Sequence, residues 1–413
     1  MDEIAQAHGA EPPLPPALKR RIEREFAARW RDEWGGRFVL HGRPPGPNAV
    51  RLDGNDYLAL TGHPGIVQAQ VDALRADSQG VVQSGVFLLH THPARALEND
   101  LARFVGKEDA LLCQSGYAAN VGLLRVIADA ATPVYLDALA HMSLWEGARA
   151  AGAAAHAFRH NDPGHLGRLL HTHGPGVVVV DSVYSTTGAL CALREIVEVA
   201  ERHGATLVVD ESHALGTHGP QGAGVCALLG LTGRVHFITA SLAKAFAGRA
   251  GFFTAPAGLR HYIQISTYPY IFSSSLLPHE IAGLAATLRV VRQSDDARMR
   301  LHANTRRLRA SLAALGYPIG HGTEQIIALE AGSEAAAMRL RDELEARDVI
   351  GAIFCAPATS KHRAMVRLTL NAALTEARLR DVETAAREVA ALVHPWDWPI
   401  ARRARAAAAR AAA

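Results

Sequence analysis

Residues 241–251 have the sequence SLAKAFAGRAG, in which Lys244 stands among small and apolar residues. Apolar runs at 235–239 and 251–255 flank this stretch and predict two strands. Burial in such surroundings disfavours the ammonium form of a lysine, and the neutral amine can then attack an aldehyde. Schiff-base formation with pyridoxal 5'-phosphate (PLP) is a common use of such an amine. A lysine that extends from a strand end into solvent is the alternative, and this stretch alone does not separate the two.

A second strand end carries an acid and a histidine. Residues 206–209 are nearly all β-formers, and Asp210-Glu211-Ser212-His213 follows them. A buried aspartate requires a cationic partner, which a protonated pyridine nitrogen supplies. The alternative is a helix-capping aspartate beside a hydrogen-bonded histidine. Because Lys244 follows the next predicted strand, we expect it at the same edge of the sheet as Asp210, which favours cofactor chemistry.

The composition is typical of a large globular protein. The chain has 413 residues, of which 49% are hydrophobic and 20% charged, so we expect two lobes. A net charge of +3 gives no basis for nucleic-acid binding. The four cysteines lack the spacing of a metal site or a disulfide framework, so we expect no metal and a reducing cytoplasm. The sequence shows no signal pattern and no apolar run of membrane-spanning length, so we expect a cytoplasmic protein without a membrane partner.

Helical and strand patterns alternate along the chain, which predicts an α/β fold with a mostly parallel sheet. We expect strands at 110–113, 134–137, 177–180 and 206–209, and helices at 17–34, 66–75, 94–105, 118–127, 193–202 and 280–315. A second α+β lobe is predicted from strands at 325–329, 349–355 and 365–371 and a helix at 334–347. The predicted divisions are an N-terminal helix and arm (1–55), a large domain (56–295), a small C-terminal domain (296–395) and an Ala/Arg tail (396–413), either a frayed helix or disordered.

Further candidates for site residues follow the predicted strands. Ser115, Gly116 and Tyr117 begin a helix whose free N–H groups favour a phosphate, although a plain cap at Ser115 explains them as well. A histidine at the front of a helix, His141, is placed to stack on a flat cofactor or to serve structure only. The hydroxyl of Ser185 is expected at a carboxyl end of the sheet.

Three more polar residues have both a functional and a structural interpretation. The serine-rich turn at Ser273 provides hydroxyls for a phosphate or simply begins a helix. Asn55 lies at a turn, where asparagine is also favoured by geometry alone. Arg367 lies on an apolar strand, so we expect it to bind an anion, which is either a substrate carboxylate or a protein carboxylate.

Four motifs in this order resemble the α-oxoamine synthase family of fold-type I PLP enzymes: NDYL at 55–58, SGYAAN at 115–120, DESH at 210–213 and SLAK at 241–244. The resemblance covers about residues 50–390 and implies a PLP-dependent transferase with a seven-stranded sheet in its large domain. Within the family, segments 106–116, 141–149 and 357–361 look most like the α-hydroxyketone quorum-sensing autoinducer synthases.

The resemblance also implies a role for each candidate residue. Lys244 would form the Schiff base with PLP, Asp210 would pair with the ring nitrogen and His141 would stack on the ring. The phenolic oxygen would lie near Ser185 and His213. The remaining expectations are a phosphate site with Gly116, Tyr117 and Ser241, to which Ser273 of the second subunit of a homodimer is added, and an amino-acid site with Asn55 and Arg367.

The implied reaction is a decarboxylative Claisen condensation of an amino acid with an acyl-CoA. For an autoinducer synthase, a medium-chain acyl-CoA and a small amino acid such as 2-aminobutyrate, or S-adenosylmethionine, are the expected substrates. Residues 89–98 and 246–249 depart from the wider family and weaken an assignment as 8-amino-7-oxononanoate synthase or 2-amino-3-ketobutyrate CoA ligase. Those two activities and an aminotransferase remain the enzymatic alternatives. A non-catalytic subunit or a regulator is disfavoured, since Lys244 is present and no additional DNA-binding module is visible in the sequence.

Overall fold

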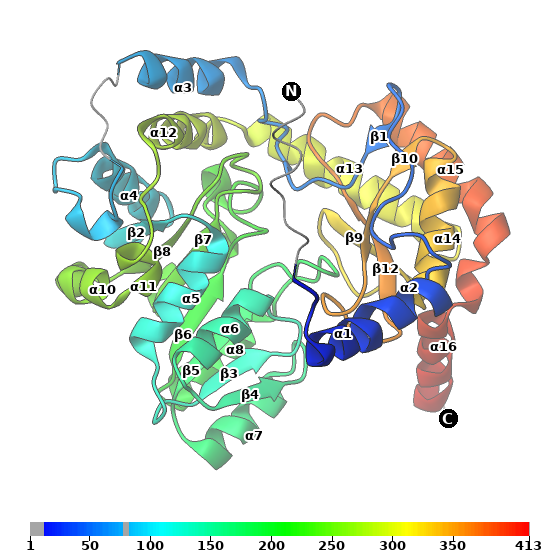
Figure 1. Ribbon diagram of the computed structural model, residues 1–413, viewed down its shortest axis with the longest axis horizontal. Helices are drawn as coiled ribbons and strands as arrows, with labels where there is room; N and C mark the ends of the chain where they lie inside the picture. The colour runs from blue at the N-terminus through cyan, green and yellow to red at the C-terminus, as the bar shows by residue number, and fades with distance from the viewer. Residues whose placement is uncertain (1–11, 77–81, 413) are drawn as a thin grey trace.

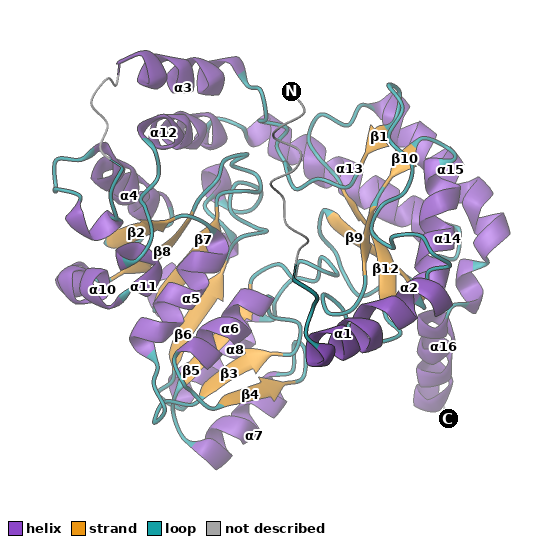
Figure 2. Cartoon of the chain, viewed as in Figure 1, coloured by secondary structure: helices purple, strands orange, loops and turns teal. Residues whose placement is uncertain are grey.

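A seven-stranded sheet forms the centre of the larger part of the molecule (Figure 2). The computed structural model describes residues 12–76 and 82–412. The strand order is β2-β8-β7-β6-β5-β3-β4, and β8 runs antiparallel to its neighbours while the other pairs are parallel. The strands are β2 Asp109–Cys113, β3 Val134–Asp137, β4 Ala155–Phe158, β5 Val177–Asp181, β6 Thr206–Asp210, β7 Phe237–Ser241 and β8 Gly251–Ala255. The predicted mostly parallel α/β sheet is confirmed.

Helices cover both faces of this sheet. Successive strand residues point to opposite faces, so Val179 belongs to one apolar core while its neighbours Val178 and Val180 belong to another. The first core is shared with α5 Gly116–Ile127 and α6 Met142–Ala150, and the second with α4 Pro93–Phe104, α7 Pro163–His173 and α8 Leu193–Arg202. Burial on both faces explains why the strand sequences are continuously apolar.

A smaller antiparallel sheet, with the order β11-β12-β9, forms the core of the C-terminal part. Its elements are β9 Ile326–Gly332, β11 Ala352–Phe354, β12 Ala364–Thr369, α13 Asp295–Ala314, α14 Glu334–Glu345 and α15 Glu376–Val393. The N-terminal segment joins this part, since β1 Val50–Arg51 pairs with β10 Val349–Ile350 and the Trp34 indole donates to Glu334. Figure 1 shows α1 Pro16–Ile22 and α2 Ala28–Asp32 beside these C-terminal elements.

The remaining helices surround the large sheet or extend from it. They are α3 Pro64–Ala76, α9 Val225–Leu228, α10 Arg260–Ser266, α11 Tyr268–Ile271 and α12 Pro278–Arg292, and α3 packs along α12 (Figure 1). No helix in the described part of the chain combines the length and apolar character needed to cross a membrane.

Several predicted elements differ from the structure. The predicted helix 280–315 is two helices, because the chain turns at Gln293 and Ser294 between α12 and α13. The predicted strand 349–355 is also two: β10 pairs with β1, whereas β11 joins the small sheet. The predicted helix 17–34 contains a π-helical segment, Glu23–Ala27, between α1 and α2. The strand β4 and the helix α7 are present in the structure but were not predicted from the sequence pattern.

The C-terminal tail also differs from one of its predicted alternatives. Disorder over 396–413 is wrong for most of this segment, because Pro399–Ala412 forms helix α16. Ile400 is buried against the small domain and Arg403 donates to Glu330 of β9, which explains why an Ala/Arg sequence is held in place. Residues 1–11 of the predicted N-terminal arm and the final residue of the tail lie outside the described residues.

Candidate active site

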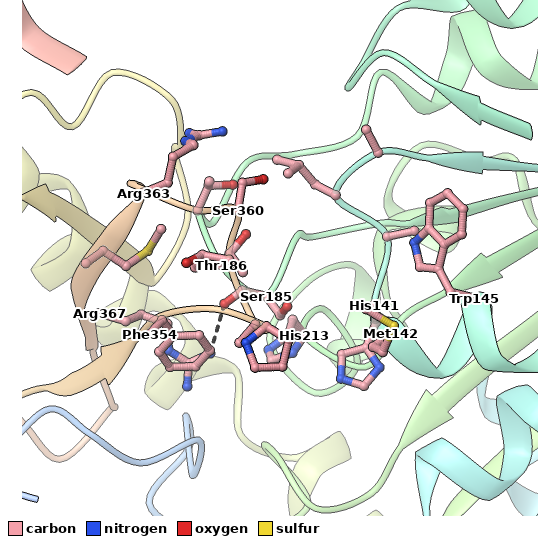
Figure 3. A pocket seen from close by; sticks show the side chains of 18 of the residues that line it. His141, Met142, Trp145, Ser185, Thr186, His213, Phe354, Ser360, Arg363 and Arg367 are labelled. Atoms are coloured by element: carbon pink, nitrogen blue, oxygen red, sulfur yellow. Dashed lines mark hydrogen bonds between the residues drawn. The ribbon is translucent and has the colours of Figure 1, made fainter. Parts of the chain in front are cut away.

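Two adjoining cavities lie at the carboxyl ends of the parallel strands. The smaller, of about 220 Å³, is lined by the start of α5 and by residues that follow β5, β6 and β7. The larger, of about 660 Å³, extends between these strand ends and the small domain (Figure 3). His141, His213 and Lys244 line both cavities, so a molecule in one can reach a molecule in the other.

Lys244 lies in the loop that leaves β7, where it is half-buried. Burial lowers the pKa of its amine, the nearby Arg367 lowers it further, and Asp210 opposes them. Within the described residues its Nζ has no ion-pair partner. The amine therefore loses its proton more readily than an ordinary lysine, and no ion pair in the described chain holds it.

Asp210, at the end of β6, is only 4% exposed and receives hydrogen bonds from neutral donors only. The Asn120 amide donates to one carboxylate oxygen at 2.7 Å, and the Ser212 backbone N–H donates to the other at 2.8 Å. In the sheet register its neighbour is Asp181, and burial together with the charge of Asp210 raises the pKa of Asp181 well above its usual range. A buried carboxylate without a cation in the described chain is suited to a cationic ligand.

His141 caps the N-terminus of α6 and is connected to Asp210 through two other side chains. Its Nδ1 lies 2.7 Å from Ser143 Oγ, which accepts from Asn120 Nδ2 at 2.9 Å. The same Asn120 nitrogen donates to Asp210. Desolvation lowers the pKa of His141, an effect that Asp210 opposes and Lys244 reinforces. The imidazole is thus neutral and held in a defined orientation at the cavity wall.

His213, in the loop after β6, is buried and is held by a residue from the N-terminal segment. Tyr57 Oη lies 2.6 Å from His213 Nδ1. Burial, followed by the charges of Lys244 and Arg367, lowers the pKa of His213 well below its usual range. The contact with Tyr57 occupies Nδ1, so Nε2 is left for a ligand in the cavities that His213 lines.

The start of α5 also lines the smaller cavity, together with Ser241 at the end of β7; the residues from α5 include Gly116 and Tyr117. Ser115 caps the helix by accepting from Ala118 N at 3.1 Å, as the structural alternative for this residue predicted, and it also lines the cavity. A Cβ on Gly116 would lie 2.6 Å from the Ser241 Cβ, so only glycine allows the helix to approach β7 this closely. The free N–H groups of the first helical turn favour an anion here.

Arg367 of β12 is 5% exposed and has no ion-pair partner in the described chain. Its Nη1 donates to the Ser185 carbonyl at 2.8 Å and its Nη2 to Asn55 Oδ1 at 3.0 Å. The third nitrogen, Nε, is buried without a hydrogen-bond partner. The guanidinium also lies over the Phe354 ring, 4.3 Å from its centroid. Of the two predicted partners, a protein carboxylate is excluded within the described residues.

Two predicted residues are not part of the smaller cavity. Ser185 lines only the larger one, and it contacts Arg367 through its carbonyl oxygen. Ser273 is exposed and lines neither cavity, and its hydroxyl donates to Pro269 O at 2.6 Å. Tyr57 and Asn120 contact site residues although no role was predicted for them; both lie inside the motifs at 55–58 and 115–120, which is the signal that could have indicated them.

Comparison with known proteins identifies the class. Residues 47–385 match the family described as aminotransferase class I and II, and the chain belongs to that family. Solved structures of Sphingomonas wittichii serine palmitoyltransferase and of SPT with its PLP internal aldimine both superpose with a TM-score of 0.84. The first is 25% identical and covers 91% of this chain and 99% of that chain, and the second is 26% identical and covers 92% and 99%.

A curated relative narrows the class further. The CAI-1 autoinducer synthase of Vibrio campbellii is 45% identical over 383 residues, which are 93% of this chain and 97% of that protein. With these relatives, the protein is a PLP-dependent acyltransferase of the α-oxoamine synthase class.

The residues of the smaller cavity fit PLP. Asp210 offers a buried carboxylate to a ring nitrogen, Lys244 offers an unpaired amine to an aldehyde, and the start of α5 offers N–H groups to a phosphate. A buried acceptor, Asn120 Oδ1, lacks a hydrogen-bond partner in the described protein. A polar aromatic ligand such as PLP would supply partners to these unpaired polar groups.

Proposed function

We propose that the protein condenses an α-amino acid with a medium-chain acyl-CoA and releases an α-aminoketone, carbon dioxide and CoA. The product would be the precursor of a quorum-sensing autoinducer. The observation that carries this proposal is the unpaired Arg367 at the wall of a large cavity that adjoins the cofactor-sized one. A buried arginine without an acid is suited to the carboxylate of the amino acid.

The residues around the smaller cavity would hold the cofactor. In this proposal Lys244 binds it covalently, Asp210 pairs with its ring nitrogen and His141 stacks on its ring. Its phosphate is held by Gly116, Tyr117 and Ser241, and by the partner subunit's Ser273 in a cytoplasmic homodimer. The support is that all of these residues except Ser273 line the smaller cavity.

When bound, PLP supplies an electron sink that stabilises negative charge at the α-carbon of the amino acid. Lys244, with its lowered pKa, is neutral often enough to remove the α-proton and return it. Asp210 keeps a proton on the ring nitrogen, and the Asn120 and Ser212 donors hold its carboxylate in place. His213 would hydrogen-bond the bound molecule through Nε2, because Tyr57 engages Nδ1.

Arg367 and Asn55 would orient the amino-acid carboxylate, while the larger cavity would take the acyl chain. Its wall includes the apolar side chains of Leu139, Met142, Trp145, Phe354 and Met365. These side chains suit an alkyl chain. The amino donor is proposed to be small, such as 2-aminobutyrate, or S-adenosylmethionine.

Product analysis tests this function directly. Purified holoenzyme is incubated with a mixture of acyl-CoAs of different lengths and with single amino acids, and CoA release and product mass are measured. We expect CoA release with medium-chain acyl-CoAs and a product whose mass is that of the acyl group plus the amino acid, less carbon dioxide and one hydrogen atom, which leaves on the CoA thiol. Lys244→Ala should abolish both.

Other results would replace the proposal with an alternative. Preference for pimeloyl-CoA with alanine would indicate an 8-amino-7-oxononanoate synthase, and preference for acetyl-CoA with glycine a 2-amino-3-ketobutyrate CoA ligase. Amino transfer to an oxo acid without CoA release would indicate an aminotransferase. Absence of turnover with every pair would contradict the acyl-transfer proposal.

A further inference from the structure

Three potential metal ligands converge outside the two cavities. His218 lies in the loop after β6, His302 is on α13, and Glu324 lies just before β9. One ligand atom from each lies within 4.8 Å of the others. His218 is 6% exposed, and the other two are partly buried. None of the three lines either active-site cavity.

Thr217 orients both imidazoles. Its hydroxyl donates to Ala214 O at 3.0 Å, so at its 2.9 Å contact with His218 Nδ1 it acts as the acceptor. Its carbonyl oxygen lies 2.8 Å from His302 Nε2 and accepts the proton of that nitrogen. Each ring therefore donates one N–H to an oxygen of Thr217, which is the support that metal-binding histidines usually have.

The other nitrogen of His218 requires a cation. His218 Nε2 lies 2.8 Å from Glu324 Oε2, and its proton is already assigned to Nδ1. A nitrogen lone pair and a carboxylate at this distance repel each other unless a proton or a metal ion lies between or beside them.

No arginine neutralises this carboxylate among the described residues. Arg309 approaches Glu324 but donates to its backbone carbonyl, at 2.9 Å from Nε. Thr323 donates to the second carboxylate oxygen at 2.7 Å. Oε2 therefore remains directed at the two histidines.

We infer that His218, His302 and Glu324 form a site for a divalent transition-metal ion of the zinc type. Two imidazoles and one carboxylate are a ligand set that zinc accepts, and water completes the coordination. The ion would connect the loop that carries His213 to the small domain. Gln325, the neighbour of Glu324, already donates to the His213 carbonyl at 2.8 Å. Metal binding at this site is independent of which substrates the enzyme uses.

Cobalt binding tests the site, because Co²⁺ reports its coordination by visible absorption. Chelator-treated holoenzyme is titrated with Co²⁺ and the bound metal is counted after gel filtration. We expect one equivalent per chain, displacement of Co²⁺ by Zn²⁺, and a melting temperature that rises with metal concentration. Glu324→Gln should abolish the absorption band, and Thr217→Val should weaken binding about 10-fold or more.

The matched control is His171→Ala, which removes an exposed histidine of α7. It should leave Co²⁺ binding unchanged. The cofactor absorption and melting temperature without metal show whether each variant is folded. If the wild type binds no Co²⁺, or if folded Glu324→Gln binds it as tightly as the wild type, the site is a proton-mediated His–Glu pair and the inference is wrong.

Discussion

Two basic side chains without an acidic ion-pair partner in the described chain, Lys244 and Arg367, line the larger cavity. Arg367 is held by a carbonyl oxygen and by an asparagine, and its Nε has no partner. Lys244 is half-buried, and the charge of Arg367 contributes to lowering its pKa. An anionic ligand would therefore stabilise Arg367, and loss of a proton would stabilise Lys244. The proposed reaction requires both: binding of a carboxylate and a neutral amine.

Arg367→Ala should weaken amino-acid binding more than the chemical step. Loss of charge-assisted hydrogen bonds costs about 2 kcal/mol, or roughly 30-fold in KM for the amino acid. Steady-state kinetics with each substrate varied in turn measures the effect. Arg363→Gln is the matched control, since Arg363 lines the same cavity but already pairs with Glu330. An unchanged amino-acid KM in Arg367→Ala would contradict the assignment.

Arg367→Gln should also raise the pKa of Lys244. Removing a nearby positive charge makes the ammonium form less unfavourable, so the pKa moves up toward its ordinary value. Labelling of Lys244 by an amine-reactive reagent in PLP-free protein, followed by peptide mass spectrometry across pH, gives the midpoint. We expect the midpoint at higher pH in the variant and no change in Arg51→Gln, whose side chain is 60% exposed. A midpoint that stays or falls would show that Arg367 does not act on this amine.

At the scale of elements, the smaller cavity depends on how closely α5 approaches the ends of β7 and β8. Gly116 allows this approach, and Gly251 of β8 allows it from the other side, because a Cβ on Gly251 would overlap the backbone nitrogen of Gly116. The start of α5 is thereby fixed against the sheet. The predicted anion site thus rests on the contact between a helix and two strands.

Gly116→Ala should separate α5 from β7 and weaken PLP binding. The added methyl group would lie 2.6 Å from the Ser241 Cβ, and overpacking of this kind costs about 1–3 kcal/mol. PLP affinity, measured by absorption, should fall about 10-fold or more, with a lower melting temperature. Gly258→Ala is the control, since a Cβ there meets no atom within 4 Å. Equal PLP affinity in both variants would exclude the proposed phosphate position.

At the scale of the whole molecule, the region around Ser273 suggests a second copy. Phe272 is 75% exposed and Ile265 is 69% exposed, and both lie in or beside α10 and α11. Large apolar side chains exposed on neighbouring helices are typical of an interface. This supports the proposed homodimer, in which Ser273 lies outside the cavities of its own chain.

Mixed dimers test whether Ser273 acts across the interface. Light scattering should first give twice the mass of one chain. Lys244→Ala and Ser273→Ala chains are then combined in one dimer, where a trans arrangement leaves one site with both native residues. We expect about half of the wild-type activity in this hybrid and none in the Lys244→Ala homodimer. If the hybrid is no more active than expected from Ser273→Ala alone, Ser273 acts in its own chain or not at all.

The sequence alone indicated most of the strands and helices and the residues at the strand ends, although β4 and α7 were not evident from it. Apolar periodicity is a local property, so the sheet and the positions of Lys244 and Asp210 could be predicted from it. Apolar periodicity could not predict the division of residues 349–355, which form one apolar run in the sequence but belong to two sheets.

Only the tertiary structure decided which residues meet across the chain. It placed Tyr57 against His213, left Arg367 without an acid in the described chain, and brought His218, His302 and Glu324 together. The physical reason is that such contacts depend on the packing of distant segments, which no local spacing encodes. Local periodicity thus determined the framework that holds Lys244, and long-range packing determined the charges around it.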